Sequence, residues 1–285
     1  MISRNWRTSG GSVVSQPLPL WTHLEAILQR CVSPEHCALF LDYDGTLTPI
    51  VADPDAARLN QEMRSVLRAL IGHPHYRVAI VSGRGLADLR ARVDAEGLFL
   101  AGNHGLEIEG PGLRYEHPAA QRHRHQLAAL RQSLHRDLDG IPGAWVEDKG
   151  PTLSIHFRRV PEALVPTVQE RVKHRVRLAI DSGMFTLRTG KAVLEIRPCV
   201  PWDKGEAVRW LLQQWRRGQP SSTTLAVYIG DDDTDEDAFR MLSADGIGIV
   251  VGSDRLHSTA HYYLESVEET ARFLSVLARL EHPPP

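Results

Sequence analysis

Apolar runs of strand length alternate with amphipathic segments of helix length in the first third and the last third of this chain. Residues 39–41, 78–81 and 225–229 are apolar runs typical of strands that are buried on both faces. Between them, residues 60–70 place apolar side chains at helical spacing, and Gly72 is suited to end that helix. This alternation predicts an α/β fold with a parallel sheet flanked by helices.

The pattern changes between about residues 112 and 197. A helix is predicted over 120–138, and a second helix is predicted from Pro161 onward. Residues 145–158 are predicted as a half-buried strand, because Leu153, Ile155 and Phe157 alternate there with Ser154, His156 and Arg158. Thr189-Gly190 predicts a tight turn between two further strands. Helices mixed with antiparallel strands predict an inserted α+β cap domain.

The chain is therefore expected to have three parts. Residues 1–20 contain Ser, Gly and Pro without a continuous apolar segment, so they are expected to form a flexible leader. Residues 21–111 and 198–285 are expected to form the α/β core, and residues 112–197 the cap domain. At 285 residues, the chain is long enough for this arrangement.

Acidic side chains directly follow two of the apolar runs. Asp42 and Asp44 come after residues 39–41, and the acidic stretch 231–236 comes after residues 225–229. Ligands of open α/β sheets bind beyond the carboxyl ends of the strands, and burying an unpaired carboxylate is costly. Two strands with acidic ends, far apart in sequence, can hold one divalent cation between them.

The residue types also suit phosphoryl transfer. Asp42 is positioned to be a nucleophile, and Asp44 to be a general acid and then a general base. Ser82 can donate a hydrogen bond to a phosphoryl oxygen, and Lys204 can neutralise charge on the nucleophile and the phosphate. Asp231 can complete a magnesium site, with Asp232 and Asp235 as helpers. Each residue alone is weak evidence, but their order along the chain, each at a strand or helix edge, is not expected by coincidence.

That order resembles the haloacid dehalogenase-like phosphohydrolases. The resemblance implies Mg²⁺ as cofactor, with Asp42, Asp44, Asp231, Asp232 and Asp235 as the candidate metal-binding residues, and an aspartyl-phosphate intermediate on Asp42. It also implies a Rossmann-like parallel sheet core, and an inserted α+β cap domain that closes over a small substrate and excludes water.

Finer motifs, LDYDGTLTPI, VSGR, GNHGLE, VEDK, LEIRP, WDKG and GDDDTDED, together resemble the trehalose-6-phosphate phosphatases. This resemblance implies that the cap holds the sugar through Glu147, Lys149, Arg158, Lys191 and Glu195. Strand parity supports part of this assignment. Lys191 and Glu195 are four residues apart in one predicted strand, so their side chains are expected on the same face. The alternative is that these charges coat the solvent face of a two-layer cap.

Two further positions keep open alternatives. His104 either touches the substrate or braces the crossing from core to cap. Arg84 either helps to bind the phosphate or orients an acidic neighbour. Both are retained as candidate substrate-binding residues, together with Asp42 and Asp44.

Composition narrows the remaining possibilities. The chain is 42% hydrophobic and 24% charged with a formal net charge of −2, so nothing indicates a nucleic acid or a membrane surface as partner. No apolar stretch approaches the roughly 18 residues that span a bilayer. Cys31, Cys37 and Cys199 lack metal-ligand spacing. A reducing cytoplasm is therefore the expected compartment. We also expect a monomer, and the resemblance implies a small sugar phosphate as its partner.

The expected activity is Mg²⁺-dependent hydrolysis of trehalose 6-phosphate to trehalose and phosphate. One alternative keeps the chemistry but takes another sugar phosphate, such as sucrose phosphate or a mannosyl phosphoglycerate. The second is a phospho-acceptor domain without turnover, which uses Asp42 as receiver domains do. Asp44 argues against it, because a second carboxyl group is suited to protonating a leaving group.

Overall fold

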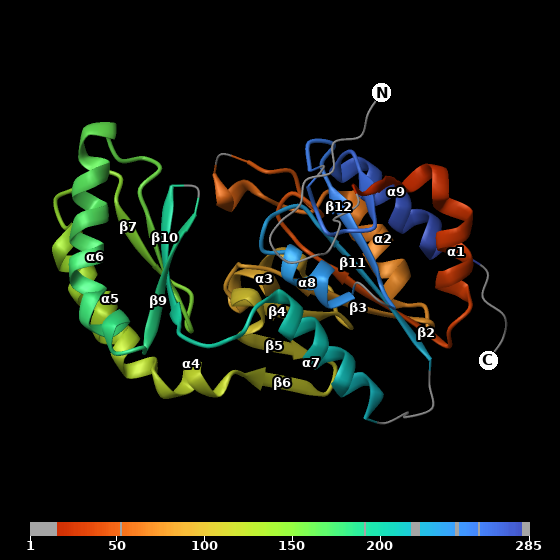
Figure 1. The fold of residues 1–285 in the computed structure, drawn as a ribbon, viewed down its shortest axis with the longest axis horizontal. Helices are drawn as coiled ribbons and strands as arrows, with labels where there is room; N and C mark the ends of the chain where they lie inside the picture. Colours follow the sequence, from red (N-terminus) through yellow and green to blue (C-terminus); the bar gives the residue numbers. More distant parts are fainter. Residues whose placement is uncertain are drawn as a thin grey trace. The chain divides into compact units, whose positions relative to one another are not determined.

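The computed structural model describes residues 16–51, 53–190, 192–217, 223–242, 245–255 and 257–280. Its contacts divide the chain into two compact units, coloured along the sequence in Figure 1. The core unit comprises residues 1–82, 90–100 and 203–285, and the cap unit comprises residues 83–89 and 101–202. The sequence predicted a cap over 112–197, which lies within the longer of the two segments of this unit. The exact domain limits stay a prediction.

The core unit is built on parallel strands that run in the order β1-β13-β12-β11-β2-β3. These strands are β1 (Leu18–Pro19), β2 (His36–Leu41), β3 (Tyr76–Val81), β11 (Thr224–Gly230), β12 (Ile247–Val251) and β13 (Tyr262–Leu264). Leu39, Phe40 and Leu41 are fully buried in the centre of the sheet. The α/β class predicted from the alternating pattern is therefore confirmed. Leu18 and Pro19, which the sequence placed in the leader, pair with β13; residues 1–15 lie outside the described residues.

Helices of the core unit lie against this sheet (Figure 1). They are η1 (Leu20–His23), α1 (Leu24–Val32), η2 (Pro54–Ala56), α2 (Gln61–Ile71), α7 (Lys204–Arg216), α8 (Glu236–Leu242) and α9 (Val267–Ala278), while α3 (Leu86–Val93) is shared between the units. α2 packs on α9, and α7 packs on α8. Asp203 caps α7 by accepting a hydrogen bond from the backbone N–H of Glu206 at 2.9 Å, which fixes Lys204 in the first turn.

The cap unit contains an antiparallel sheet in the order β7-β8-β10-β9, with α5 and α6 side by side against one face (Figure 1). Its elements are β7 (Trp145–Asp148), β8 (Leu153–His156), β9 (Phe185–Gly190), β10 (Val193–Pro198), α4 (Pro118–Arg122), α5 (Arg124–Leu138), η4 (Glu162–Leu164) and α6 (Val165–Asp181). β4 (Phe99–Gly102), η3 (Asn103–Gly105), β5 (Glu107–Gly110) and β6 (Leu113–Glu116) precede them, with β5 and β6 paired as a hairpin. The face toward the helices is apolar, so the other face carries the polar side chains.

Two strand predictions in the cap are wrong in detail. Residues 145–158 form two strands, β7 and β8, because the chain turns back where the N–H of Lys149 donates to the carbonyl of Thr152. Thr189-Gly190 is not the turn, because Gly190 pairs with Val193 and Thr189 pairs with Leu194 within the ladder. A Gly can fill a paired strand position, so its presence alone did not locate the turn.

Two helix predictions shift as well. The helix expected over 120–138 is broken at His123, which has φ −101° and ψ 12° and separates α4 from α5. The helix expected from Pro161 begins at Val165, after the short helix η4. Pro166 occupies the first turn of α6, where a missing N–H costs nothing. None of the described helices is long and apolar enough to cross a membrane.

The apolar cluster between the cap sheet and its helices should make the free energy of unfolding sensitive to the loss of a buried side chain. Leu134→Ala removes a fully buried side chain of α5 and should lower the free energy of unfolding by about 2–5 kcal/mol. Leu178→Ala on α6 is the matched control, because Leu178 is 76% exposed and its loss should stay within about 0.5 kcal/mol. Urea unfolding followed by circular dichroism measures both. Equal effects would contradict the assigned packing.

Candidate active site

The acidic ends of β2 and β11 lie side by side. The two strands are parallel neighbours with Leu41 opposite Ile229, and the N–H of Asp42 donates to the carbonyl of Ile229 at 2.9 Å. Asp231 follows one residue after β11 ends in its glycine. Strand register therefore brings together two carboxyl groups that are 189 positions apart in the sequence.

A buried lysine connects this acidic edge to α7. Lys204 Nζ donates to Asp42 Oδ1 and to Asp235 Oδ1, each at 2.7 Å, and the lysine side chain is 2% exposed. Burial acts to lower the pKa of Lys204, but the carboxylates of Asp235 and Asp42 outweigh it and raise that pKa above its ordinary value. Lys204 therefore carries its positive charge inside the site.

Asp235 organises the loop that follows β11. Its Oδ1 also accepts a hydrogen bond from the hydroxyl of Tyr228 at 2.5 Å. Its Oδ2 accepts from the backbone N–H groups of Asp231 and Asp232, both at 3.0 Å. With four hydrogen bonds, Asp235 is held by its surroundings, and it fixes the loop conformation at Asp231.

Asp231 offers a buried carboxylate oxygen that is suited to binding a cation. Its Oδ1 is buried and has no hydrogen-bond partner among the described residues. Burial, with the charges of Asp235 and Asp232, raises the pKa of Asp231 to about 7. Asp42, Asp231 and Asp235 each offer a carboxylate oxygen, and these oxygens lie within 4.8 Å of one another. An all-oxygen set of this size and charge suits a hard divalent cation.

Gly45 allows the Asp231 side chain to approach the segment that follows β2. Gly45 has φ +84°, and a Cβ built there would lie 2.1 Å from Asp231 Oδ2. Any other residue at this position would displace the carboxylate and would strain the backbone. The Gly of the D-x-D-G-T motif is thus required by the same geometry that gathers the acidic groups.

The remaining core candidates differ in burial. Ser82 directly follows β3 and is 1% exposed, at the same sheet edge as Asp42 because β3 pairs with β2. Asp44 is half-buried and forms an isolated bridge with Thr48. The Asp232 side chain is 49% exposed and accepts hydrogen bonds from the N–H and hydroxyl of Thr234. Asp232 is therefore the most solvent-exposed of the candidate metal residues in this loop.

In the cap unit, three of the predicted sugar-binding residues form a charged cluster. Lys149 Nζ lies 3.9 Å from Glu147 Oε2 and 3.7 Å from Glu195 Oε1, and it donates to the carbonyl of Gly83 at 3.3 Å. His156 Nε2 lies 2.8 Å from Glu147 Oε2. Burial acts to raise the pKa of Glu147, but the His156 hydrogen bond and the charge of Lys149 outweigh it, so this pKa is lower than usual.

His104 joins the same cluster. Its Nε2 lies 2.6 Å from a guanidinium nitrogen of Arg197 and 3.8 Å from Glu195 Oε2. Asn103 and His104 both have left-handed backbone angles, φ 52° and 56°, which are costly for residues other than Gly and often occur at functional sites. The Asn103 side chain donates to the Lys149 carbonyl at 2.9 Å and accepts from the Thr152 hydroxyl at 2.8 Å. The GNHG segment therefore holds the turn that carries Lys149.

Other predicted cap residues lie elsewhere or outside the described residues. Arg158 is exposed and comes two residues after the end of β8. Lys191 lies outside the described residues, so its expected shared face with Glu195 is untested. Arg84 Nη1 forms an ion pair with Asp88 at 3.0 Å, one of the two alternatives left open for this arginine.

Some residues of the site were not among the sequence candidates. Arg197 shares strand parity with Glu195, and its Nε donates to Glu195 Oε2 at 2.6 Å, so parity could have identified it. His156 stacks under Trp145, with ring centroids 4.2 Å apart, and shares the polar face of β8 with Ser154. Tyr228 gave no signal, because an aromatic residue inside an apolar strand is usually part of the core.

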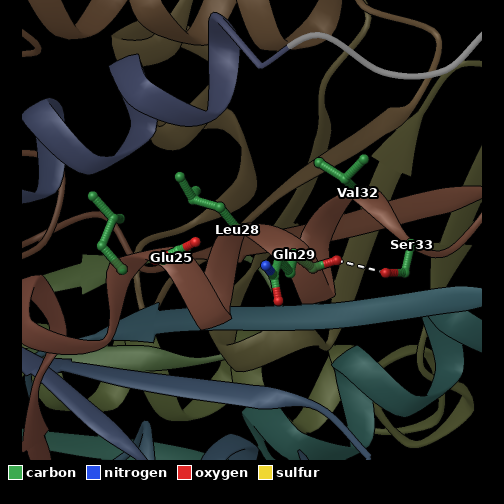
Figure 2. Close-up of a pocket in the computed structure, with 6 residues that line it drawn as sticks. Glu25, Leu28, Gln29, Val32 and Ser33 are labelled. Atoms are coloured by element: carbon green, nitrogen blue, oxygen red, sulfur yellow. Dashed lines mark hydrogen bonds between the residues drawn. The ribbon is translucent and has the colours of Figure 1, made fainter.

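The described residues also line a groove away from these clusters. Figure 2 shows Glu25, Leu28, Gln29, Val32 and Ser33 along one side of α1, with the Ser33 hydroxyl donating to the Gln29 carbonyl at 2.6 Å. Its ionisable lining is the single carboxyl group of Glu25. This groove lacks the paired acidic and basic groups that phosphoryl transfer requires.

A parallel sheet with acidic strand ends and a buried lysine, together with an inserted α+β unit, is the architecture of the haloacid dehalogenase-like fold class. A haloacid dehalogenase-like hydrolase from Bacteroides thetaiotaomicron shares the fold, with a TM-score of 0.59 at 16% identity over 85% of this chain and 99% of that chain. A family model for trehalose-phosphatase matches residues 40–268. The chain belongs to the trehalose-phosphatase family, and the resemblance drawn from its motifs is confirmed.

Two curated relatives are similar in sequence to this chain. Trehalose-phosphate phosphatase B of Arabidopsis thaliana is 40% identical over 250 residues, which cover 84% of this chain and 65% of that protein. An uncharacterized glycosyl hydrolase of Mycobacterium tuberculosis is 38% identical over 276 residues, 95% of this chain and 20% of that protein. The chain thus spans less than two thirds of either relative.

Solved structures show the same fold. The C-terminal domain of Candida albicans trehalose-6-phosphate phosphatase has a TM-score of 0.74 at 24% identity, over 92% of this chain and 98% of that chain. Trehalose-6-phosphate phosphatase from Aspergillus fumigatus has a TM-score of 0.64 at 25% identity, over 93% and 98% of the two chains. Both similarities extend through the core and the cap elements of this chain.

Lys204 pairs with both Asp42 and Asp235, so its substitution should lower the stability of the protein strongly. Lys204→Met removes the cation and leaves Asp42 and Asp235 facing each other in a buried site, so the free energy of unfolding should fall by about 3–5 kcal/mol. Lys173→Met, on the exposed face of α6, is the matched control and should change it by less than about 0.5 kcal/mol. Urea unfolding without added metal measures both. A Lys204 variant as stable as its control would contradict the assigned interaction.

Proposed function

We propose that this chain hydrolyses trehalose 6-phosphate to trehalose and phosphate through an aspartyl-phosphate on Asp42. The observation that carries the proposal is the Asp42–Lys204–Asp235 hydrogen-bonded group beside the unpartnered oxygen of Asp231. Such an arrangement supplies a carboxylate nucleophile, a fixed positive charge and a cation site within one buried edge of a sheet. Membership of the trehalose-phosphatase family supports the substrate.

In the first half-reaction, Asp42 attacks the phosphorus atom. Lys204 binds Oδ1 of Asp42, so Oδ2 is the oxygen left to form the new P–O bond. As the bond between phosphorus and the sugar oxygen breaks, Asp44 transfers a proton to that oxygen and trehalose leaves. Ser82 and Lys204 stabilise the negative charge of the phosphoryl oxygens.

The second half-reaction returns the enzyme to its starting state. Asp44, now ionised, removes a proton from a water molecule, and the resulting nucleophile attacks phosphorus. The bond between phosphorus and Asp42 breaks, so inorganic phosphate is released and the Asp42 carboxylate is restored. Asp44 is protonated again and ready for the next substrate, which balances the cycle.

Mg²⁺ is the proposed cofactor. Asp42, Asp231 and the backbone carbonyl of Asp44 would hold it, while Asp235 and Asp232 shape the loop at Asp231. The fit rests on Asp231 Oδ1, a buried carboxylate oxygen that lacks any other partner among the described residues. When bound, Mg²⁺ neutralises charge on the phosphate and on the nucleophile, so that the two anions can approach each other.

The cap unit is proposed to recognise the sugar. Glu147, Lys149 and Glu195 present a carboxylate–ammonium–carboxylate cluster suited to binding hydroxyl groups. Arg158 and Lys191 are retained as further candidates from the family resemblance, as are Arg84 and His104. A site built from buried polar groups discriminates strongly, because the wrong sugar leaves some of those groups unpaired.

The proposal includes the setting of the enzyme. We propose a cytoplasmic monomer that acts on a small sugar phosphate. The near-neutral charge balance of the chain supports the part of this proposal that leaves out nucleic acid and membrane as partners. A phosphatase for another sugar phosphate remains the alternative, and the substrate panel below separates the two.

Phosphate release tests the reaction. The chain should release phosphate from trehalose 6-phosphate in the presence of Mg²⁺ and lose this activity with a chelator, while glucose 6-phosphate and sucrose 6-phosphate react poorly. Asp42→Asn should abolish turnover, and Asp44→Asn should slow it by about 10²–10⁴-fold. Metal-dependent release that favours another sugar phosphate would refute the substrate. A stable phosphorylated Asp42 without phosphate release would refute the reaction.

The cap cluster predicts a separate effect on selectivity. Glu195→Gln removes a charge that binds hydroxyl groups, so KM for trehalose 6-phosphate should rise roughly tenfold or more. Turnover of p-nitrophenyl phosphate should stay within about twofold, because that ester lacks the sugar. Glu170→Gln on the exposed face of α6 is the matched control. Equal losses on both substrates would show that Glu195 acts on folding or chemistry rather than on the sugar.

A further inference from the structure

Strand register aligns four polar side chains in one row across the cap sheet. Ser154 on β8 lies opposite Glu147 on β7 and opposite Glu195 on β10, and Glu195 lies opposite Arg188 on β9. The neighbouring positions Leu153 and Ile155 belong to the apolar cluster on the other side of the sheet. The row therefore lies on the polar face, and Ser154 lies between the two glutamates.

The hydroxyl of Ser154 lacks a hydrogen-bond partner among the residues that the structure describes. Ser154 is 1% exposed, and its Oγ makes no hydrogen bond to any described residue. Buried hydroxyl groups in folded proteins are almost always satisfied, because an unpaired donor is costly. His156, two residues further along the same face, does have a partner, since its Nε2 lies 2.8 Å from Glu147 Oε2.

The carboxylate of Glu195, opposite Ser154, has an oxygen that lacks a hydrogen-bond donor among the described residues. Glu195 Oε2 accepts a hydrogen bond from Arg197 Nε at 2.6 Å. Glu195 Oε1 is buried and makes no hydrogen bond to any described residue, and Lys149 Nζ, its ion-pair partner, lies 3.7 Å away, beyond hydrogen-bond distance. A donor without an acceptor thus stands directly across the ladder from an acceptor without a donor.

One ligand group can satisfy both atoms. Side chains at directly opposite positions have Cβ atoms about 4.5–5.5 Å apart. A hydroxyl oxygen hydrogen-bonds at roughly 2.7–2.8 Å, so a single hydroxyl group placed between two side-chain oxygens can reach both. A sugar hydroxyl can accept from Ser154 and donate to Glu195 at the same time, which an ammonium group or an unprotonated phosphate oxygen cannot do.

We propose that Ser154 is a further specificity-determining residue, whose hydroxyl donates to one sugar hydroxyl that in turn donates to Glu195 Oε1. This inference rests on the proposed function, because it assigns a residue to the sugar-reading face of the same enzyme. The serine supplies a hydrogen-bond donor that the glutamates on either side of it cannot supply, since a carboxylate only accepts.

The test compares Ser154→Ala with Ser258→Ala in the full chain with Mg²⁺. Trehalose binding is measured by titration calorimetry, and thermal unfolding is measured without sugar. Ser258 is also buried, at 3% exposure, but its Oγ accepts from the N–H of Ala260 at 3.1 Å, so it is a matched serine with a satisfied oxygen.

Ser154→Ala should weaken trehalose binding roughly two- to tenfold, the effect of one neutral hydrogen bond. Its melting temperature should stay the same or rise, because the substitution removes an unpaired buried hydroxyl. Ser258→Ala should show the reverse, unchanged binding and a lower melting temperature. Among monodeoxy trehaloses, the analogue that lacks the bridging hydroxyl should bind the wild type and Ser154→Ala equally.

Two results would overturn the proposal. If Ser154→Ala binds trehalose as tightly as the wild type does while the wild type hydrolyses trehalose 6-phosphate, a buried water satisfies the serine and only this inference fails. If Ser154→Ala weakens binding but also lowers the melting temperature as Ser258→Ala does, Ser154 is structural. A wild type that neither binds trehalose nor hydrolyses its phosphate would instead overturn the proposed function itself.

Discussion

The buried ammonium of Lys204 is the interaction on which the core site depends. Asp42, Asp231 and Asp235 gather at one sheet edge, and three carboxylates that close together in a buried position would repel one another and resist ionisation. A lysine that donates to two of them offsets that cost and leaves the third, Asp231, for a cation. The first turn of α7, capped by Asp203, is therefore as much a part of the site as the strand ends are.

The loop after β11 shows how the backbone is adapted to the same charges. Asp235 turns back over Gly230, where a Cβ would lie 2.3 Å from the Asp235 carboxyl carbon. This approach lets Asp235 accept the N–H groups of Asp231 and Asp232 while its other oxygen binds Lys204 and Tyr228. One carboxylate thus ties the loop, the helix and the strand together.

The sequence predicted the α/β core and the residues at its strand ends, because a carboxylate directly after a buried strand is conspicuous. Tyr228 could not be predicted as a site residue, since its hydroxyl reaches Asp235 only because the loop after β11 folds back toward the strand. In the cap, Gly190 was mistaken for a turn residue because register depends on the partner strand, which one strand's pattern does not specify. Arg197 was missed although its parity with Glu195 placed it on the same face. The roles of the individual site residues stay proposals.

Chemistry and selectivity depend on different kinds of position in this chain. Of the groups proposed for the phosphoryl-transfer site, Asp42, Lys204 and Asp235 are tied to one another by hydrogen bonds, so a change at one disturbs the others. The polar face of the cap sheet is organised differently, because each side chain there alternates with one buried on α5 and α6. Ser154 can be changed while Leu153 and Ile155 keep their packing. Substitutions on that face can therefore alter sugar recognition without altering the fold or the phosphoryl chemistry.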